Sequence, residues 1–318
     1  MTLPLPALPD ATSPSSPVRR QDFFADLIDR ARALATVSVA VAYPVTEVAI
    51  SGALLAAREQ LVHPLLVGPE AVIRATAAAA SLDLAGAAII PAADEDEAAR
   101  KAVALCKGGQ ASALMKGSLH TDTFLRAVLA SESGLRTSRR LSHVFVLDAP
   151  SYPRLLFITD AAINIYPTLD DKVDILKNAI DLAQALGIAQ PRVAILSAVE
   201  TVNPKIASTL DAAALCKMVD RGQIPGAIVD GPLAFDTAVS PSAAAIKGLV
   251  SPVAGIADVL LVPDLESGNM LAKQLEYLGG AELAGIVLGA RVPIVLTSRA
   301  DSARARLASC AVASLCAR

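Results

Sequence analysis

Residues 258–273 read Asp-Val-Leu-Leu-Val-Pro-Asp-Leu-Glu-Ser-Gly-Asn-Met-Leu-Ala-Lys, and this stretch predicts the class of fold. The apolar residues 259–262 have the length and the β-branched content of a strand buried on both faces. Pro263 cannot donate to a sheet, so the strand should end there. After a short acidic loop, apolar residues recur at helical spacing. A strand, a loop and a helix in this order form the repeating unit of an α/β fold.

The loop of this unit is a candidate ligand site, because open α/β sheets bind ligands at the carboxyl ends of their strands. Asp264 lies in the loop, and Gly268 and Asn269 are expected to open the helix, where free N–H groups suit an anion. We therefore expect these three residues to bind substrate. The simpler alternative is a connecting loop in which Asn269 caps the helix.

Composition narrows the class of protein. Of 318 residues, 53% are apolar and 19% charged, and Trp is absent, so Ala, Leu and Val should build the core of an α/β protein. Lys and Arg number 28 against 31 Asp and Glu, which argues against nucleic acid and membrane surfaces as partners but allows a local basic pocket. Neither a membrane span nor a secretory signal is predicted. Four cysteines without metal-binding spacing indicate a reduced, cytoplasmic protein with no metal site.

The rest of the chain repeats the strand–helix unit. Residues 1–17 are rich in Pro and Ser and are expected to form a disordered tail. Four strand–helix alternations within about 120 residues then predict a mostly parallel sheet with helices on both faces. The polar segment 131–140 should cross into a second domain, in which a strand over residues 227–229 ends at a turn over residues 230–232. The last helix should run from about residue 302 to residue 316.

The turn after the fourth predicted strand carries phosphate-binding chemistry. It reads Lys116-Gly117-Ser118, and His120 and Thr121 start the next helix. Glycine allows a close backbone approach, hydroxyl and N–H groups can bind phosphate oxygens, and lysine adds a positive charge. The spacing is not that of a Walker A loop, and the alternative is a capped surface turn.

Further charged residues lie at predicted strand ends and between the domains. Arg136, Arg139 and Arg140 fall in the inter-domain segment, and three guanidinium groups in five residues favour a phosphate contact, expected first at Arg136. Asp160 and Asp230 each follow a strand. Either carboxylate could cap a helix or turn, or could contact substrate.

The last candidate follows the final strand and reads Thr297-Ser298-Arg299-Ala300-Asp301. Ser298 can donate to a developing oxyanion, Arg299 can bind phosphate, and Asp301 can accept a proton. The alternative is that Ser298 or Asp301 caps the last helix, a contribution of about 1 kcal/mol.

Together these residues resemble the phosphate acetyltransferase/phosphate butyryltransferase family, over nearly the whole chain from about residue 20. The resemblance rests on seven blocks: Met115-Lys116-Gly117-Ser118 with His120-Thr121, Gly134-Leu135-Arg136-Thr137, Ser142-His143-Val144, Asp230-Gly231-Pro232, and residues 251–255, 263–269 and 297–299. Several blocks are more similar to the butyryl branch, or to the acyltransferase half of hydratase-linked enzymes, than to the acetyl branch.

Two departures from the acetyl branch concern charged residues. Where that branch has an arginine after its Gly-Asn pair, this chain has Glu276-Tyr277. Where it has an acid beyond its Ser-Arg pair, this chain has Arg304-Ala305. The general base therefore stays open between Asp301 and no strong base at all.

The resemblance implies two α/β/α domains with a cleft between them, similar to the isocitrate/isopropylmalate dehydrogenase architecture. The first domain would comprise residues 18–138 and 290–318, and the second residues 139–289. The enzyme would be a homodimer.

The implied activity is direct transfer of an acetyl or another short acyl group from acyl-CoA to inorganic phosphate in a ternary complex. Coenzyme A would be a substrate, and no cofactor would be bound. Ser298, Arg299 and Asp301 would be catalytic. The substrate-binding residues would be Lys116, Gly117, Ser118, His120, Thr121, Arg136, Asp264, Gly268 and Asn269.

Three rival functions stay open. One is a phosphate butyryltransferase specific for C4 acyl groups. Another is a metal- and NAD-dependent decarboxylating dehydrogenase of the same fold, which would need clustered aspartates where this sequence has separated ones. The third is a non-catalytic ligand-binding paralogue, which is less favoured because the Ser-Arg pair and the phosphate loop are both present.

Overall fold

The structure is a computed structural model that describes residues 21–297 and 301–317. Its strands are β1 (Val37–Ala42), β2 (Val62–Gly68), β3 (Ala88–Pro91), β4 (Ala113–Lys116), β5 (Ser142–Asp148), β6 (Leu156–Thr159), β7 (Arg192–Leu196), β8 (Ile228–Leu233), β9 (Val259–Leu261), β10 (Glu282–Leu288) and β11 (Ile294–Val295). Its α-helices are α1 (Phe23–Arg32), α2 (Glu47–Arg58), α3 (Glu70–Ala79), α4 (Glu95–Lys107), α5 (Thr121–Leu129), α6 (Leu169–Ala185), α7 (Ala207–Asp220), α8 (Phe235–Val239), α9 (Pro241–Ile246), α10 (Leu265–Tyr277) and α11 (Ala303–Cys316). A 3₁₀ turn spans Ser131–Ser133.

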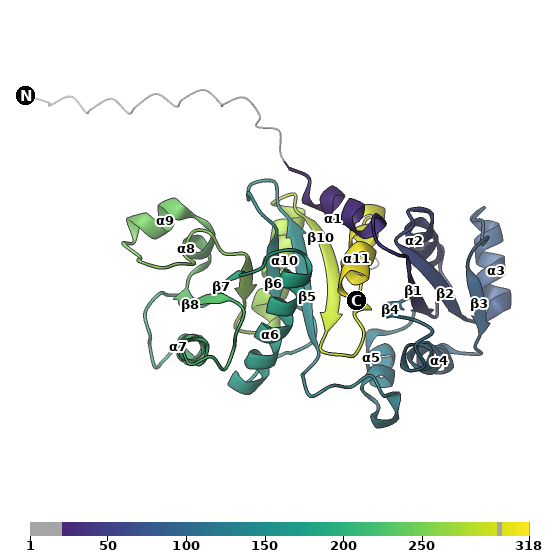
Figure 1. Ribbon diagram of the computed structural model, residues 1–318, viewed down its shortest axis with the longest axis horizontal. Helices are drawn as coiled ribbons and strands as arrows, with labels where there is room; N and C mark the ends of the chain where they lie inside the picture. Colours follow the sequence, from purple (N-terminus) through teal and green to yellow (C-terminus); the bar gives the residue numbers. More distant parts are fainter. Residues whose placement is uncertain (1–20, 298–300, 318) are drawn as a thin grey trace, which may run out of the picture.

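Within these residues, the strands form one sheet that crosses the whole molecule in the order β3-β2-β1-β4-β11-β10-β5-β6-β9-β7-β8 (Figure 1). The five strands at the β3 end, up to β11, are parallel, and so are the four strands from β6 to β8. Among the strands of the described residues, antiparallel pairing occurs only where β10 and β5 join these blocks. The predicted α/β class and mostly parallel sheet are confirmed.

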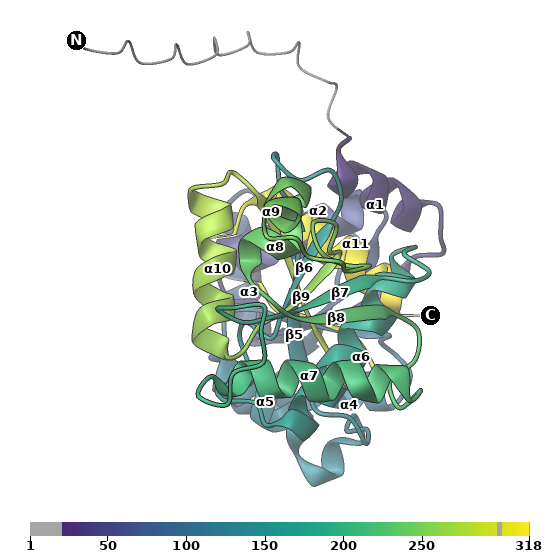
Figure 2. The same ribbon diagram turned by 90° about the vertical axis from the view of Figure 1, so that its left-hand side faces the viewer.

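Helices cover both faces of this sheet. Figure 2 shows α7 on one side of the strands from β6 to β8, and α8 and α9 on the other. In the first half of the chain, α2 covers the same face of the sheet as α1 and α11, and α4 covers the opposite face. None of the helices in the described ranges combines the length and the apolar character needed to cross a membrane.

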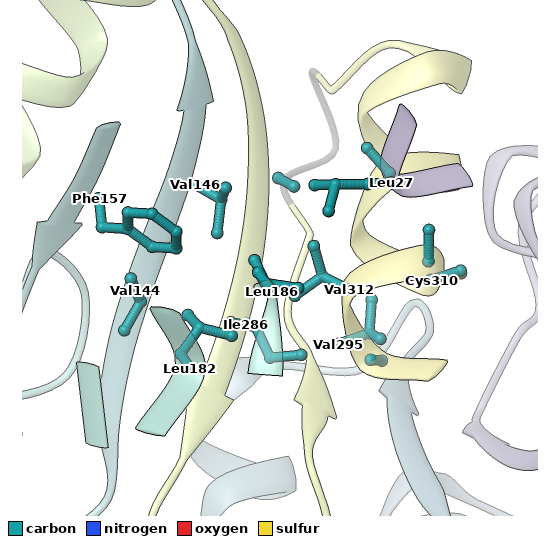
Figure 3. Packing of buried hydrophobic residues seen from close by; sticks show 14 of the residues in the cluster. Leu27, Val144, Val146, Phe157, Leu182, Leu186, Ile286, Val295, Cys310 and Val312 are labelled. Carbon is teal, nitrogen blue, oxygen red and sulfur yellow. The ribbon is translucent and has the colours of Figure 1, made fainter. Parts of the chain in front are cut away.

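One face of the sheet carries a single hydrophobic core that extends through both halves of the chain (Figure 3). It joins residues of α1 and α11 to residues of α6 and of the central strands, among them Leu27, Val312, Leu182, Val144 and Ile286. We call this the shared core. Burial of such side chains contributes about 1.5–3 kcal/mol each. This face therefore holds the two halves together.

The opposite face carries two separate hydrophobic clusters. One lies under α4 and α5 and includes Phe124 and Val287. The other lies under α8 and α10 and includes Leu147 and Leu283. Gly285 lies on β10 midway between Leu283 and Val287, so the boundary between the two clusters crosses the sheet there.

Two expectations about element boundaries are wrong. The helix after β9 begins at Leu265 and not at Gly268, because the Asp264 carboxylate accepts a hydrogen bond from Ser267 N (2.8 Å) in a capping box. Gly268 and Asn269 therefore lie inside α10. The expected turn at residues 230–232 is part of β8, and a proline fits there because β8 is an edge strand. The last helix agrees with the prediction.

Candidate active site

The carboxyl ends of β1, β4 and β11 form a crevice. After β1 the chain continues into α2 on the shared-core face, whereas after β4 it continues into α5 on the opposite face. Neighbouring strands whose helices diverge in this way leave room for a ligand at their carboxyl ends. The register of β4 and β11 pairs Val295 with Met115, so Thr297 follows beside the Lys116 turn.

A cavity of about 330 Å³ lies at this position. Its lining comes from the start of α2, the end of β4 and the turn after it, the second residue after β11 and the first turn of α11. The lining residues are Thr46, Val48, Ala49, Met115, Lys116, Gly117, Ser118, Thr297 and Arg306. The structure therefore brings the predicted phosphate turn together with the residue that precedes Ser298.

Gly117 and Ser118 hold this crevice in shape. A Cβ added at Gly117 would lie 2.4 Å from Ala42 O and 2.8 Å from Tyr43 O, so the close backbone approach predicted here is made to the β1–α2 loop. Ser118 Oγ accepts from Thr46 N (3.2 Å) and lies 2.9 Å from Thr46 Oγ1. The serine hydroxyl therefore already has partners at the start of α2.

The other residues of the predicted phosphate turn differ in their placement. Lys116 is half-buried and lines the cavity, with Nζ 3.5 Å from Gly117 O. His120 is exposed and precedes α5, and its backbone N–H donates to Glu95 Oε2 (3.4 Å). Thr121 is the first residue of α5. Neither His120 nor Thr121 lines the cavity.

The three predicted catalytic residues lie in the segment between β11 and α11. Ser298 and Arg299 lie outside the residues that the structure describes. Asp301 is half-buried and precedes α11. The N-cap of α11 is Ser302, which accepts from Ala305 N at 3.0 Å.

Asp160 follows β6, and its side chain stabilises the turn over the next four residues. The side chain is buried, and its carboxylate accepts from Ala162 N (2.9 Å), Ile163 N (3.0 Å) and Asn164 Nδ2 (2.5 Å). Burial raises the pKa of this carboxyl, and the hydrogen bonds oppose that rise. Of the two readings of Asp160, a turn residue is the one these contacts describe.

The predicted binding residues of α10 gather beside this turn. Asn269 Nδ2 donates to Ala161 O (3.1 Å), and a Cβ at Gly268 would come within 2.9 Å of Asp160 O. Asp264 caps the helix. These three residues thus form a second locus at the carboxyl ends of β6 and β9.

The strands that lead into the two loci run in opposite directions. This is because β6 runs antiparallel to β5, and β5 is parallel to β4 and β11. A single row of paired residues crosses the sheet from Met115 on β4 to Leu261 on β9. The loops of both loci start close to this row. Four strand spacings separate β4 from β6, which is about 19 Å. The structure therefore brings Lys116 and Thr297 together, and Asp264 and Asn269 together, as two neighbouring groups.

His143 lies between the two loci and was not singled out as a functional candidate by sequence reasoning. It is 1% exposed and sits beside Gly285 at the boundary of the two clusters, and its Nδ1 has no hydrogen-bond partner among the residues that the structure describes. Burial, with a smaller effect from the Lys273 charge, lowers the pKa of its imidazole to about 3. The signal available in the sequence was a histidine inside an otherwise apolar strand.

The three arginines between the halves have different partners. Arg139 pairs with Asp181, and Arg140 pairs with Asp171 at 3.0 Å. Arg136 is exposed and makes no side-chain hydrogen bond or ion pair with any residue that the structure describes. All three line a cavity of about 470 Å³, so Arg136 has its guanidinium available to an anion there.

The cysteines and acidic residues add no further centre. Burial raises the pKa of each of the four thiols to about 12, which keeps them neutral and poorly nucleophilic. Across residues 21–297 and 301–317, no three His, Cys, Asp or Glu side chains are grouped so that they could hold a metal ion.

Comparisons with known proteins agree with this geometry. The chain matches the family described as Phosphate acetyl/butaryl transferase over residues 94–314. It is 60% identical over 289 residues to a phosphate acetyltransferase of Rhizobium meliloti, covering 91% of this chain and 92% of that protein. It is 44% identical over 294 residues to a phosphate butyryltransferase of Clostridium acetobutylicum, covering 92% and 98%. The crystal structure of a branched-chain phosphotransacylase from Enterococcus faecalis superposes with a TM-score of 0.78 at 32% identity, over 89% of this chain and 99% of that one. The chain therefore belongs to the phosphate acetyltransferase/phosphate butyryltransferase family.

Proposed function

We propose that this enzyme is a phosphate acyltransferase that converts acyl-CoA and inorganic phosphate to acyl phosphate and CoA. The observation that carries the proposal is the pairing of β11 with β4, which sets Thr297 beside the Lys116 turn in one cavity. A basic residue and the approach to the Ser-Arg pair thereby share a crevice at the carboxyl ends of the strands. The names of the relatives support transfer of an acetyl or a butyryl group.

The reaction we propose is a direct transfer. A phosphate oxygen attacks the thioester carbonyl, a tetrahedral oxyanion forms, and the C–S bond breaks to release CoA as a thiolate that takes up a proton. Lys116 and Arg299 would hold the phosphate, and Ser298 would donate to the oxyanion. Holding both substrates in one site can supply several kcal/mol of the barrier.

Proton transfer needs little assistance in this scheme. A thiol with a pKa near 8.5 is a few per cent ionised at neutral pH, so a base accelerates the reverse reaction only modestly. Asp301, three residues after Ser298, is the acid–base candidate. The alternative to a role for Asp301 is that the thiolate leaves without a dedicated acid.

The binding path of CoA is proposed from the remaining groups. Its thioester would lie in the crevice beside Thr297, and its extended arm would pass toward Asn269 and the second locus. Arg136 would contact one of its phosphate groups, since its guanidinium has no carboxylate partner among the described residues. His120 and Thr121 would contribute to phosphate binding at the start of α5.

The test is substitution of Ser298 by Ala, followed by phosphate-dependent thiol release from acetyl-CoA and butyryl-CoA. Loss of one oxyanion donor should lower kcat by about 10²–10³ with little change in KM. Ser302→Ala is the matched control, because Ser302 caps α11 and its loss should cost stability but not turnover. Equal losses in kcat and affinity for Ser298→Ala, or none, would reject its role.

Acyl length and assembly belong to the same proposal. We propose a homodimeric, cytoplasmic enzyme of two domains, residues 18–138 with 290–318 and residues 139–289, in the isocitrate/isopropylmalate dehydrogenase architecture. The two separate clusters on one face of the sheet support that division. A panel of acyl-CoA substrates from two to six carbons separates a C4-specific enzyme from a broader one. An assay for reduced cofactor with 2-hydroxy diacids tests the dehydrogenase alternative.

A further inference from the structure

The cavity beside Thr297 has an apolar part that the proposed phosphate chemistry does not use. Val48 and Ala49 come from the first turn of α2, and Met115 comes from β4. The polar part of the lining includes Lys116, Thr297 and Arg306, and no carboxylate of the described residues lines the cavity. One ligand in this cavity would therefore contact both basic and aliphatic side chains.

Val48 is the apolar residue of this group that folding does not require. Its neighbours Ile50 and Ala53 are buried in the shared core, whereas Val48 is 44% exposed. A single exposed valine is ordinary on a protein surface. Here, however, it lines a cavity together with Ala49 and Met115, at the end of the sheet where ligands bind.

The position of the reacting carbon connects this apolar lining to the substrate. The proposed function puts the thioester in the crevice beside Thr297, so its alkyl group must occupy adjoining space. Lys116 lines the same cavity and suits the phosphate, so the aliphatic lining is left for the alkyl chain. Each methylene group placed against such a surface contributes about 0.8 kcal/mol.

We infer that Val48, Ala49 and Met115 form the acyl-chain pocket, and that the side chain at position 48 limits the length of the acyl group. This inference rests on the proposed function, and it names the part of the site that distinguishes acetyl from longer substrates. A hydrophobic pocket discriminates one methylene by roughly 10- to 200-fold, which sets the scale of the effect.

The experiment changes the size of residue 48 in both directions. Val48→Phe should lower kcat/KM for butyryl-CoA relative to acetyl-CoA by about tenfold or more, and Val48→Ala should shift the preference toward longer chains. The KM for phosphate should not change in either variant. Val72→Phe on α3 is the matched control, because Val72 is also 44% exposed and does not line the cavity.

The outcomes separate this inference from the proposed function. If the wild-type enzyme releases CoA in a phosphate-dependent way but neither Val48 variant changes the chain-length preference, the inference is overturned and the function stands. If both variants instead raise the KM for phosphate equally with every acyl group, the cavity binds the anion and the inference is again overturned. A wild-type enzyme without phosphate-dependent release would overturn the function and the inference with it.

Discussion

At the scale of single residues, Gly117 has a severe steric requirement beside the cavity that Thr297 lines. A Cβ there would lie 2.4 Å from Ala42 O and 2.9 Å from Pro44 N, both of them backbone atoms. Gly117→Ala should therefore force the β4–α5 and β1–α2 loops apart, lower the free energy of unfolding by roughly 1–3 kcal/mol and reduce turnover. Urea unfolding and phosphate-dependent thiol release measure the two effects.

The control for Gly117 is a glycine at which the steric conflict would be much smaller. At Gly108 an added Cβ would meet nothing closer than 3.3 Å, and φ is −80°. Gly108→Ala should leave turnover unchanged. Similar losses of stability and activity in both variants would contradict the steric argument.

His143 should make the stability of the protein depend on pH. Its pKa in the folded state is about 3 because the ring is buried, whereas the reference value is 6.5. The unfolded chain therefore binds this proton first, and stability is lost as pH falls from about 6.5 toward 3. Between pH 7 and pH 5 the loss should be about 2 kcal/mol.

The measurement is urea unfolding of the wild-type enzyme and of His143→Gln at both pH values. The variant has no imidazole to protonate, so its stability should fall by about 2 kcal/mol less over this interval. All other titrating groups are common to the two proteins. Parallel pH profiles would show that His143 is not held neutral by burial.

At the scale of elements, Asp264 can be tested for a role beyond capping α10. Its carboxylate accepts from Ser267 N (2.8 Å), and Asp94 caps α4 in the same way through Glu97 N (2.8 Å). Asp264→Ala and Asp94→Ala should each cost about 1 kcal/mol of stability. If Asp264 also binds substrate, its variant alone should raise the KM for acyl-CoA.

One outcome would contradict a substrate-binding role for Asp264. Equal stability losses with unchanged kinetics in both would make Asp264 a structural cap only. Asp264→Ser, which keeps a capping oxygen, should then restore the stability of α10 without any effect on KM.

The boundaries of elements show what local patterns could and could not predict. Residues 259–262 predicted a strand because they are apolar and β-branched, and β9 confirms it. The start of α10 was predicted at Gly268 and Asn269, after a short acidic loop, but Asp264, four residues before Gly268, makes the cap. Residues 230–232 form part of a strand and not a turn because of their position in the sheet. A proline would disrupt a central strand, but it fits the edge strand β8.

The candidate site was predictable in chemistry but not in partners. The sequence shows that Ser118 has a hydroxyl near a predicted strand end, and only the structure shows that Thr46 occupies it. Likewise, Arg136, Arg139 and Arg140 are equivalent in composition. Their distinction comes from carboxylates such as Asp181 and Asp171, which lie about 30 or more positions away along the chain.

At the scale of the whole molecule, the strand order lay beyond sequence reasoning. β11 inserts between β4 and β10, so residues separated by about 180 positions become neighbours. Periodicity reports which residues are buried, but it carries no information on which strand covers which edge. The alternation of strands and helices therefore predicted the layers, and the pairing of β11 with β4 had to come from the structure.

The shared core leads to a prediction about how the two halves unfold. Leu27 of α1 belongs to the same core as residues of α6 and β9, and Arg30 Nη1 donates to Leu186 O (2.6 Å) at the end of α6. We therefore expect both halves to unfold in one cooperative transition. Amides of β1 and β9 should exchange with solvent deuterium at the same free energy of opening.

Leu27→Ala provides the sharpest form of this test. Removing a side chain that is 2% exposed should cost about 2–5 kcal/mol. If the halves unfold together, the protection of β9 should fall by as much as that of β1, although Leu27 lies in the first half of the chain. If only the β1 amides lose protection, the separate clusters on the opposite face, and not the shared core, set the unit of unfolding.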